Sequence, residues 1–294
     1  AQRVSEIGLT LKRITDNFTN VQLLVTGSSS FELQSNLNEP LTGRKYEYHL
    51  YPISTAELYD SQGLLPVKQM FESRLIYGSY PDIINHTDEA KELLMNIANS
   101  YLYKDLLAMN EIRRPILLEK LLIALALQVS SEVSYNEVAQ TIGTDNKTVE
   151  KYIDLLEKCY VIFRLNAFNR NLRTELKKSK KIYFYDNGIR NAVIQNFAPL
   201  SLRQDTGALW ENFFISERIK ANHYNGNYAK SFFWRTTQQQ EIDYIEEADG
   251  NFTAFEMKWN PNKRPITFPS PFLNNYPVKE TVVITPENYL EWVM

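Results

Sequence analysis

Two alternating segments on either side of Asp249-Gly250 constrain the fold of this chain more than any other feature. The segments read QQEIDYIEEA and NFTAFEMKW, and each alternates apolar with polar residues. An Asp-Gly pair between alternating runs is typical of a β-hairpin with a two-residue turn. Such a turn places Asp243 directly opposite Glu256, with side chains that start about 4.5 to 5.5 Å apart.

Two facing carboxylates destabilise a hairpin unless a cation or a proton lies between them. Lys258 lies two residues beyond Glu256, on the same face of the strand, and could supply that cation. Mg²⁺ could also do so, because it prefers carboxylate oxygens as ligands. A third acid, Glu211, lies on a helix predicted over residues 206–219. The alternative is that these side chains form the solvated face of an antiparallel strand.

Charge is unevenly distributed along the chain. The net charge is −3, from 32 Lys and Arg against 35 Asp and Glu. The segment from Arg164 to Lys181, however, contains seven basic residues and a single acid, Glu175. A basic segment in an acidic protein is a candidate contact for a polyanion such as DNA. It could equally be a solvated surface.

The composition excludes several classes of protein. The 15 Phe, 18 Tyr and 4 Trp indicate a packed core in two or three domains, and not a disordered chain. One cysteine, Cys159, excludes an internal disulfide framework, and with three histidines a zinc cluster is not expected. The longest apolar run, Leu121 to Leu127, is far shorter than the roughly 18 residues of a membrane span. Charges near the N-terminus do not fit a secretory signal, so we expect no membrane contact and a cytoplasmic location.

The first sixty residues read as α/β structure. The expected elements are a helix over 4–18, a buried strand over 21–27, a helix with a capping box at Ser29 and Glu32, an alternating strand over 45–50, and a helix capped by Ser54 and Glu57. Small hydroxylated residues between a strand and a helix can hold an anion at the helix N-terminus. They can also form an ordinary turn.

Helical patterns dominate residues 64–130, with breaks at Pro81 and Pro115. Two short helices then follow, over 135–142 and onward to Glu157, with Gly143 at the turn between them. Predicted strands over 161–165 and 181–185 flank a basic loop. This order is that of a winged helix, and the loop would be its wing. DNA contact would then involve Arg170, Arg173, Lys177 and Lys178 of the wing, although many winged helices dock proteins instead.

Several motifs together resemble a known prokaryotic family. AQRVSEIGLTLK, VQLLVTGSSS, LTGR and YPIS-x-x-EL, in that order, resemble the second half of an AAA-type ATPase domain. KIYFYDNGIRNAV, GALWENFFISE, WRT, EIDYI and FEMKW are similar to the domain of unknown function that follows this ATPase in many proteins. The phosphate loop of such ATPases, G-x-x-x-x-G-K-[ST], does not occur in this sequence. The resemblance therefore implies a chain truncated just after the Walker B motif, which binds and hydrolyses ATP only within a full-length protein.

The resemblance also implies roles for individual residues. Thr26 or Ser28 would sense the nucleotide, and Arg44 would act as an arginine finger or sensor. The terminal domain resembles the restriction-endonuclease-like fold with its PD-(D/E)xK motif, although Ile242 stands where the motif has proline. By that resemblance Asp243 and Glu256 would bind Mg²⁺, and Lys258 and Glu211 would be catalytic.

We therefore expect a multidomain protein of the α/β and α+β classes. Its parts would be the rear of a P-loop ATPase sheet over 1–60, a helical region over 61–130, a winged helix over 131–200 and a nuclease-like α/β domain over 201–294. The expected function is that of an AAA-type ATPase family protein that lacks its nucleotide-binding front, acts on or binds DNA, and has a nuclease-like C-terminal domain. The alternative is a non-enzymatic module that docks a protein partner through the winged helix and an inactive nuclease-like fold.

Overall fold

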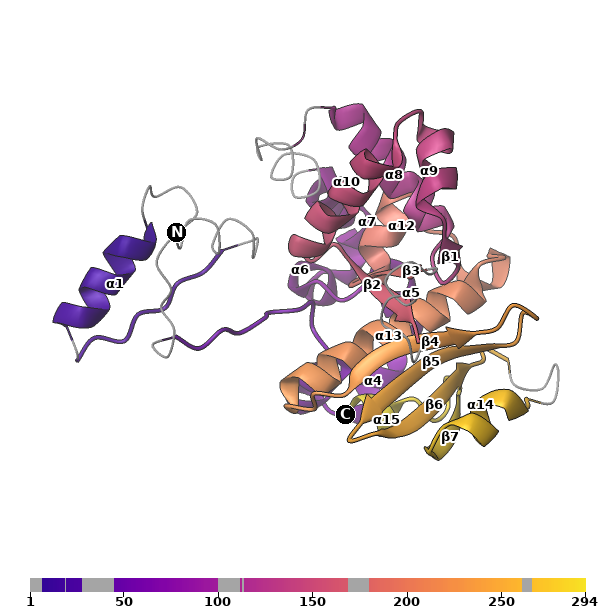
Figure 1. Cartoon of the computed structure of the whole chain (residues 1–294). Coiled ribbons are helices and arrows are strands. Elements are labelled where there is room, and N and C mark those ends of the chain that lie inside the picture. The colour runs from indigo at the N-terminus through magenta and orange to yellow at the C-terminus, as the bar shows by residue number, and fades with distance from the viewer. Residues whose placement is uncertain are drawn as a thin grey trace.

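One mixed β-sheet organises the fold (Figure 1). The computed structural model describes residues 7–18, 20–27, 45–99, 112, 114–168, 180–260 and 266–294. In these residues it contains 13 α-helices, two short 3₁₀ helices and a seven-stranded sheet. The chain is thus of the mixed α/β type.

The sheet has the order β1-β3-β2-β4-β5-β6-β7. Its strands are β1 (Glu132–Val133), β2 (Ile162–Ala167), β3 (Lys180–Phe184), β4 (Lys230–Arg235), β5 (Glu241–Ala248), β6 (Asn251–Met257) and β7 (Val278–Ile284). Neighbouring strands are antiparallel except for the pairs β2 with β4 and β6 with β7, which are parallel. Strands from residues 131–200 and from residues 201–294 therefore form a single sheet.

The helices begin and end at local sequence signals. They are α1 (Ile7–Asn17), α3 (Thr55–Gln62), α4 (Leu64–Gln69), α5 (Phe71–Tyr77), α6 (Pro81–Asn85), α7 (Ala90–Ile97), α8 (Pro115–Leu127), α9 (Tyr135–Ile142), α10 (Asn146–Lys158), α12 (Asn187–Val193), α13 (Thr206–Tyr224), α14 (Ser270–Asn275) and α15 (Leu290–Val293). The predicted capping box of Ser54 and Glu57 is present at α3, and Pro81 and Pro115 open their helices. Gly143 ends α9 in the left-handed conformation at φ 78°, as the predicted turn requires.

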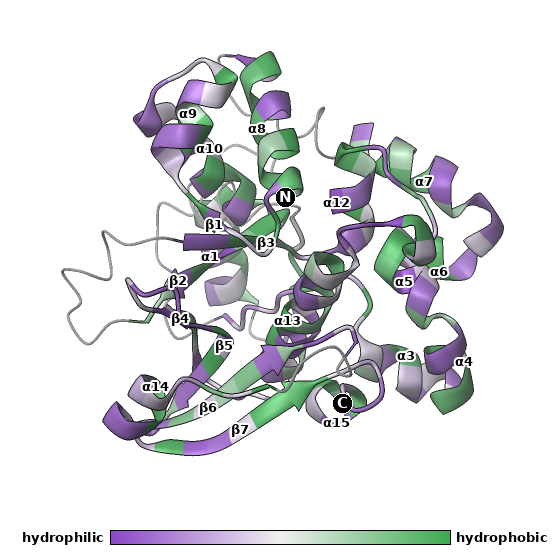
Figure 2. Ribbon diagram, turned by 90° about the vertical axis from the view of Figure 1, so that its right-hand side faces the viewer, coloured by the Kyte–Doolittle hydropathy of each residue, from purple (hydrophilic) through white to green (hydrophobic). Residues whose placement is uncertain are grey.

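Helix α13 packs against one face of the sheet and α14 against the other. On the α13 side, Trp210 and Phe214 lie in one buried cluster with Tyr244 and Phe255 of the central strands. On the α14 side, Phe272 lies in a separate cluster with strand residues that include Ile242. Helix α8 is apolar over most of its surface (Figure 2), as expected for a helix within a third cluster formed mainly by α7 to α10 and α12.

The predicted strands over 21–27 and 45–50 are wrong. Neither segment forms a strand of the described sheet, and Leu24, Tyr46 and Leu50 are 89%, 89% and 92% exposed. A β-strand needs a neighbour to satisfy its backbone groups, and none of the described strands pairs with either segment. The apolar patterns are those of strands, but the sheet described here does not include them. The helix expected at Ser29 and Glu32 lies outside the described residues.

The hairpin prediction is confirmed. Strands β5 and β6 pair with Tyr244 opposite Phe255 and Ala248 opposite Asn251, the register that a two-residue turn requires. Asp249 and Gly250 have φ values of 50° and 77°. Two successive positive φ values define a type I′ turn, whose twist matches that of the two strands.

Replacing Gly250 with alanine is expected to lower the free energy of unfolding by about 1 kcal/mol, because an L side chain resists φ 77°. A Cβ atom at this position would meet nothing within 4 Å, so the cost comes from the backbone alone. Gly207→Ala is the matched control, since its Cβ also meets nothing but lies in helix α13. That variant should gain stability. Urea denaturation of both variants tests the prediction, and equal effects would contradict it.

Candidate functional site

The hairpin brings three of the predicted site residues together. The Nζ atom of Lys258 lies 2.9 Å from Oε2 of Glu256 and 4.0 Å from Oδ2 of Asp243. The lysine ammonium therefore lies between the two carboxylates, where the sequence predicted a compensating cation. The side chains of Asp243 and Glu256 are only 16% and 12% exposed, so the solvated-face alternative does not describe them.

A bulge in β5 determines where Asp243 lies. Phe232 pairs with Ile245, whereas Trp234 pairs with Ile242, so Asp243 and Tyr244 together stand opposite Phe233. An extra residue in one strand bends the strand and redirects a side chain, and such bulges are frequent beside functional sites. The backbone N–H of Met257 donates a hydrogen bond of 3.0 Å to Oδ2 of Asp243, which holds the carboxylate against β6.

The site includes three residues that the sequence analysis did not assign to it. Lys181 of β3 lies 2.6 Å from Oε1 of Glu241 and 3.2 Å from Oε1 of Glu211. The hydroxyl of Tyr183 donates a bond of 2.6 Å to the same Glu211 oxygen. Lys181 was counted in the basic segment, yet its side chain is only 3% exposed. The available signal was Lys181 in the strand KKIYF, where it alternates with Tyr183 on one face.

The cluster carries more negative than positive charge. Its carboxyl groups are those of Glu211, Glu241, Asp243 and Glu256, and its ammonium groups are those of Lys181 and Lys258. At its edge, Arg235 lies 3.7 Å from Glu241 and 2.6 Å from Glu132, which adds one charge of each sign. Burial, together with the charge of Asp243, raises the pKa of Glu211 to about 7. The same two causes raise the pKa of Glu256 to about 7. With Arg235 and Glu132 included, five carboxyl groups and three cationic groups are neutral only if the cluster takes up two protons or one divalent cation.

The donor set suits Mg²⁺ in its chemistry, since all four acids offer carboxylate oxygens. Within the part of the chain that the structure describes, however, no three acidic, histidine or cysteine side chains are arranged to hold a metal ion. The lysines account for this arrangement, because Lys258 lies between Asp243 and Glu256, and Lys181 between Glu211 and Glu241. A cation bound by Asp243 and Glu256 would have to displace the Lys258 ammonium.

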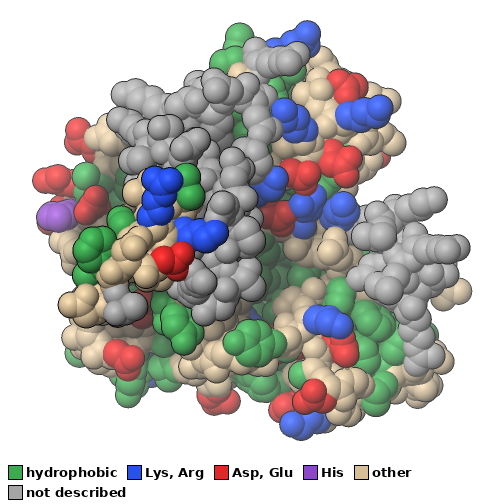
Figure 3. All heavy atoms as spheres, turned by 60° about the vertical axis from the view of Figure 1, so that its left-hand side comes forward, with side chains coloured by type: hydrophobic (Ala, Val, Ile, Leu, Met, Phe, Trp, Pro, Cys, Tyr) green, Lys and Arg blue, Asp and Glu red, His purple; other side chains and the backbone are tan. Residues whose placement is uncertain are grey.

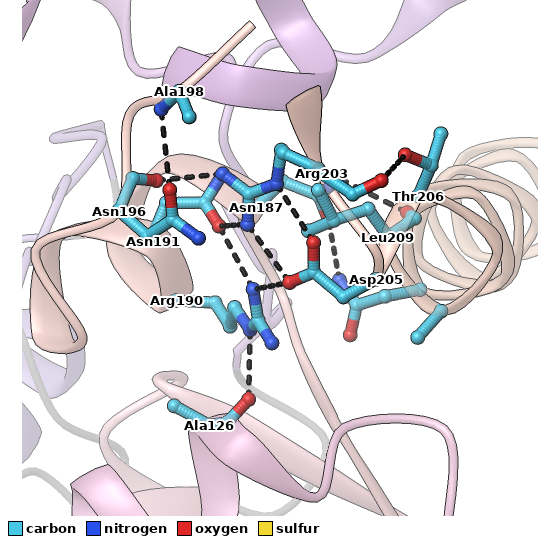
Figure 4. Close-up of polar contacts among 12 residues, drawn as sticks. Ala126, Asn187, Arg190, Asn191, Asn196, Ala198, Arg203, Asp205, Thr206 and Leu209 are labelled. Carbon is cyan, nitrogen blue, oxygen red and sulfur yellow. Dashed lines mark hydrogen bonds and ion pairs between the residues drawn. The ribbon is translucent and has the colours of Figure 1, made fainter. Parts of the chain in front are cut away.

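A buried polar network holds the start of helix α13, which carries Glu211 (Figure 4). Arg190 and Arg203 both bind Asp205, the residue before the helix, at 2.6 and 2.8 Å. Burial acts to raise the pKa of Asp205, but hydrogen bonds from the two guanidinium groups lower it to about 2. Arg190 also donates to the carbonyl of Ala126 in α8, so the helix start is tied to the helical cluster.

A second buried network holds the middle of α13. Glu217 accepts bonds of 2.6 Å from the backbone N–H and from the hydroxyl of Thr55 in α3. Its other oxygen lies 3.3 Å from Arg74 and 2.7 Å from Lys220. The side chains of Arg74, Glu217 and Lys220 are at most 2% exposed. Burial acts against the charged form, but Lys220 and Arg74 lower the pKa of Glu217 to about 2.

Of the remaining predicted site residues, the structure describes only Thr26. Thr26 is described and exposed, and Ser28 and Arg44 lie outside the described residues. The wing residues Arg170, Arg173, Lys177 and Lys178 also lie outside them, so their roles stay predictions. None of the described helices has the length and apolar character that crossing a membrane requires.

Three family matches divide the chain. Residues 1–59 match the family described as "AAA domain". Residues 68–200 match "Domain of unknown function (DUF8612)", and residues 206–291 match "Domain of unknown function (DUF4143)". The AAA-domain and DUF4143 matches support an AAA-type ATPase-like protein.

Curated proteins from bacteria and archaea are similar to the chain. An uncharacterized protein of Haemophilus influenzae is 27% identical over 186 residues, which is 60% of this chain and 46% of that protein. One of Mycobacterium tuberculosis is 24% identical over 266 residues, covering 88% of this chain and 57% of the relative. One of Methanocaldococcus jannaschii is 23% identical over 254 residues, covering 80% and 54%. The chain thus spans about half the length of these relatives, and no solved structure matches it.

Proposed function

We propose that this chain is part of an AAA-type ATPase-like protein and that its carboxylate–lysine cluster is a metal-dependent site for cleaving phosphodiester bonds in DNA. The observation that carries the proposal is the convergence of Asp243, Glu256 and Lys258 at the end of the β5–β6 hairpin, beside Glu211. Metal-assisted hydrolysis of a phosphodiester needs carboxylates that hold the cation and a positive group that offsets the charge developing on the phosphate.

Each residue has a distinct role in the proposed reaction. Asp243 and Glu256 would hold Mg²⁺, which when bound lowers the pKa of a water molecule and offsets charge on the phosphate. Glu211 would accept a proton from the attacking water, since a carboxyl group with a pKa of about 7 exchanges protons readily at neutral pH. Lys258, once displaced from Glu256, would stabilise the negative charge that develops on the phosphate oxygens.

The strand and helix order supports the nuclease-like and winged-helix interpretations. Helices α9 and α10 lie between β1 and β2, and β3 pairs with both β1 and β2, an order typical of a winged helix. Strands β4 to β7, with α13 on one face and an acid on that helix, fit a restriction-endonuclease-like core. Thr26, Ser28 and Arg44 would serve nucleotide sensing only in a protein that also has a phosphate loop.

The charges available for DNA are fewer than the sequence count suggested. Arg164 is paired with Asp154 and Glu157, and Lys181 is buried in the carboxylate cluster. On the face drawn in Figure 3, lysine and arginine side chains are interspersed with aspartate and glutamate side chains. We therefore place DNA contact on the wing residues.

Neutralising Arg170, Arg173, Lys177 and Lys178 together should weaken DNA binding at low salt. Each phosphate contact contributes about 0.9 to the slope of log K against log salt, so four lost contacts flatten it by about 3.6. Fluorescence anisotropy with a labelled duplex at several salt concentrations measures this slope. An unchanged slope in the quadruple variant would show that the wing does not contact DNA.

The test of the proposed site is whether the protein cleaves DNA with Mg²⁺ or Mn²⁺ and whether it binds Mn²⁺ in a calorimetric titration. Cleavage that stops on adding a chelator supports the proposal. Absence of both cleavage and Mn²⁺ binding overturns it. DNA-free pull-down of a protein partner would then favour the alternative of a docking module with an inactive nuclease-like fold.

A further inference from the structure

The Glu211 carboxyl group is held by a strand from a different part of the chain. Glu211 lies on α13, within the segment matched as DUF4143, whereas Lys181 and Tyr183 lie on β3, within the segment matched as DUF8612. The two donors are one strand period apart, so their side chains leave the same face of β3 and reach the same carboxyl oxygen.

The geometry fixes the orientation of that carboxyl group. The Tyr183 hydroxyl donates at 2.6 Å and the Lys181 ammonium at 3.2 Å, both to Oε1 of Glu211. Two donors on one oxygen restrict rotation about the carboxyl bond, because rotation would break both. Both donors in these contacts reach Oε1, so Oε2 would be the oxygen that meets the attacking water.

The two donors are themselves held in place. The Lys181 side chain is 3% exposed, pairs with Glu241 at 2.6 Å and lies 5.5 Å from the centre of the Phe233 ring. Tyr183 is fully buried in the cluster that also contains Phe233 and Trp210. A buried lysine is costly unless it is paired, so its two carboxylate partners keep its ammonium within this cluster.

We propose that Lys181 and Tyr183 are positioning residues for Glu211, so that the cleavage site is completed by strand β3 and is shared between the two matched segments. This inference rests on the proposed function, because it assigns Glu211 to a reaction. It adds that residues 206–291 alone do not form the working site.

Tyr183→Phe is the sharpest test, because it removes only the hydroxyl that donates to Glu211. Tyr244→Phe is the matched control: Tyr244 is equally buried in the neighbouring part of the sheet, and its hydroxyl donates to Glu246 at 3.0 Å. Loss of orientation of a reacting group typically costs on the order of 100-fold in rate. We expect kcat for DNA cleavage to fall at least tenfold in Tyr183→Phe with KM unchanged, and neither to change in Tyr244→Phe.

Crystal structures of the same variants provide a readout that does not need activity. In Tyr183→Phe and in Lys181→Met, the Glu211 carboxyl group should leave the position it has in the wild-type protein, and in Tyr244→Phe it should stay. If Lys181→Met does not fold, Tyr183→Phe carries the test.

The outcomes separate the two proposals. Wild-type cleavage with an unchanged kcat in Tyr183→Phe overturns the positioning role and leaves the proposed function standing. Absence of both wild-type cleavage and Mn²⁺ binding overturns the proposed function, and the crystal structures then decide the positioning role alone. A Glu211 carboxyl group that keeps its place in both variants overturns it, and a displaced one supports it.

Discussion

Replacing Glu217 with glutamine is expected to lower the free energy of unfolding by about 3 to 5 kcal/mol, the largest effect on stability that we predict for a single residue. The variant leaves Arg74 and Lys220 buried without the carboxylate that neutralises them. Leaving a buried charge without its partner is among the most destabilising effects of a single substitution. The stability of the buried network at the middle of α13 therefore depends on the Glu217 carboxylate.

The dependence of stability on pH provides a second measure of the same interaction. The pKa of Glu217 is lowered from 4.5 to about 2, so the folded state binds this proton more weakly than the unfolded state. The stabilisation, about 3 kcal/mol, is complete above pH 4.5 and is lost as the pH falls through 2. Urea denaturation of the wild type and of the Glu217 variant as a function of pH should show this loss of stability.

Glu119→Gln, at an exposed position on α8, is the control and should change stability by less than about 0.5 kcal/mol. A Glu217 variant as stable as this control would contradict the prediction.

Replacing Glu256 with glutamine is expected to abolish metal-dependent cleavage while raising the stability of the protein at pH 8. Cleavage should fall more than about 100-fold, because the variant loses a charged oxygen that would hold the cation. Stability should rise, because the pKa of Glu256 is raised from 4.5 to about 7 and ionisation is unfavourable in the folded state. That penalty is absent below pH 4.5, grows up to pH 7 and is complete above it, so the neutral glutamine removes up to about 3 kcal/mol at pH 8 and nothing at pH 4.

Activity assays and thermal denaturation at pH 4 and pH 8 test this combination. Glu280→Gln is the control, since Glu280 is exposed on β7 and pairs with Thr253 of the same strand that carries Glu256. This variant should keep both activity and stability. Retained cleavage in Glu256→Gln would place the reaction elsewhere, and lower stability at pH 8 would show that the ionised carboxylate stabilises the fold.

Local signals predicted elements well, whereas apolar patterns predicted strands only in part: those expected over 161–165 and 181–185 form β2 and β3, but those over 21–27 and 45–50 form none. The Asp249-Gly250 turn, the capping box at Ser54 and Glu57 and the helix end at Gly143 each involve residues within a few positions of one another. The strands expected over 21–27 and 45–50 were judged by apolar pattern alone, yet a strand exists only where another strand accepts its hydrogen bonds. The pattern does not contain that information.

The same distinction explains which site residues could be found. Asp243, Glu256 and Lys258 lie within one hairpin, so the turn fixes their relative positions. Lys181 reaches the cluster only because β2, which pairs with β3, also pairs in parallel with β4, more than 60 residues later in the chain. No local pattern predicts a parallel pairing of that kind, and the charge of Lys181 indicated solvent or DNA instead of a buried carboxylate.

The parallel pairing of β2 with β4 affects how the last third of the chain would behave as an isolated fragment. Across this pairing, Asn166 is opposite Phe232 and Ala167 opposite Phe233, and the backbone N–H of Phe168 donates to the carbonyl of Phe233 at 2.7 Å. A fragment that begins after β2 would present β4 as an open edge strand with the aromatic sequence FFW at its centre. Unprotected edges of this kind recruit strands from other molecules. The fragment is therefore expected to self-associate or aggregate, whereas the longer chain protects that edge with its own backbone.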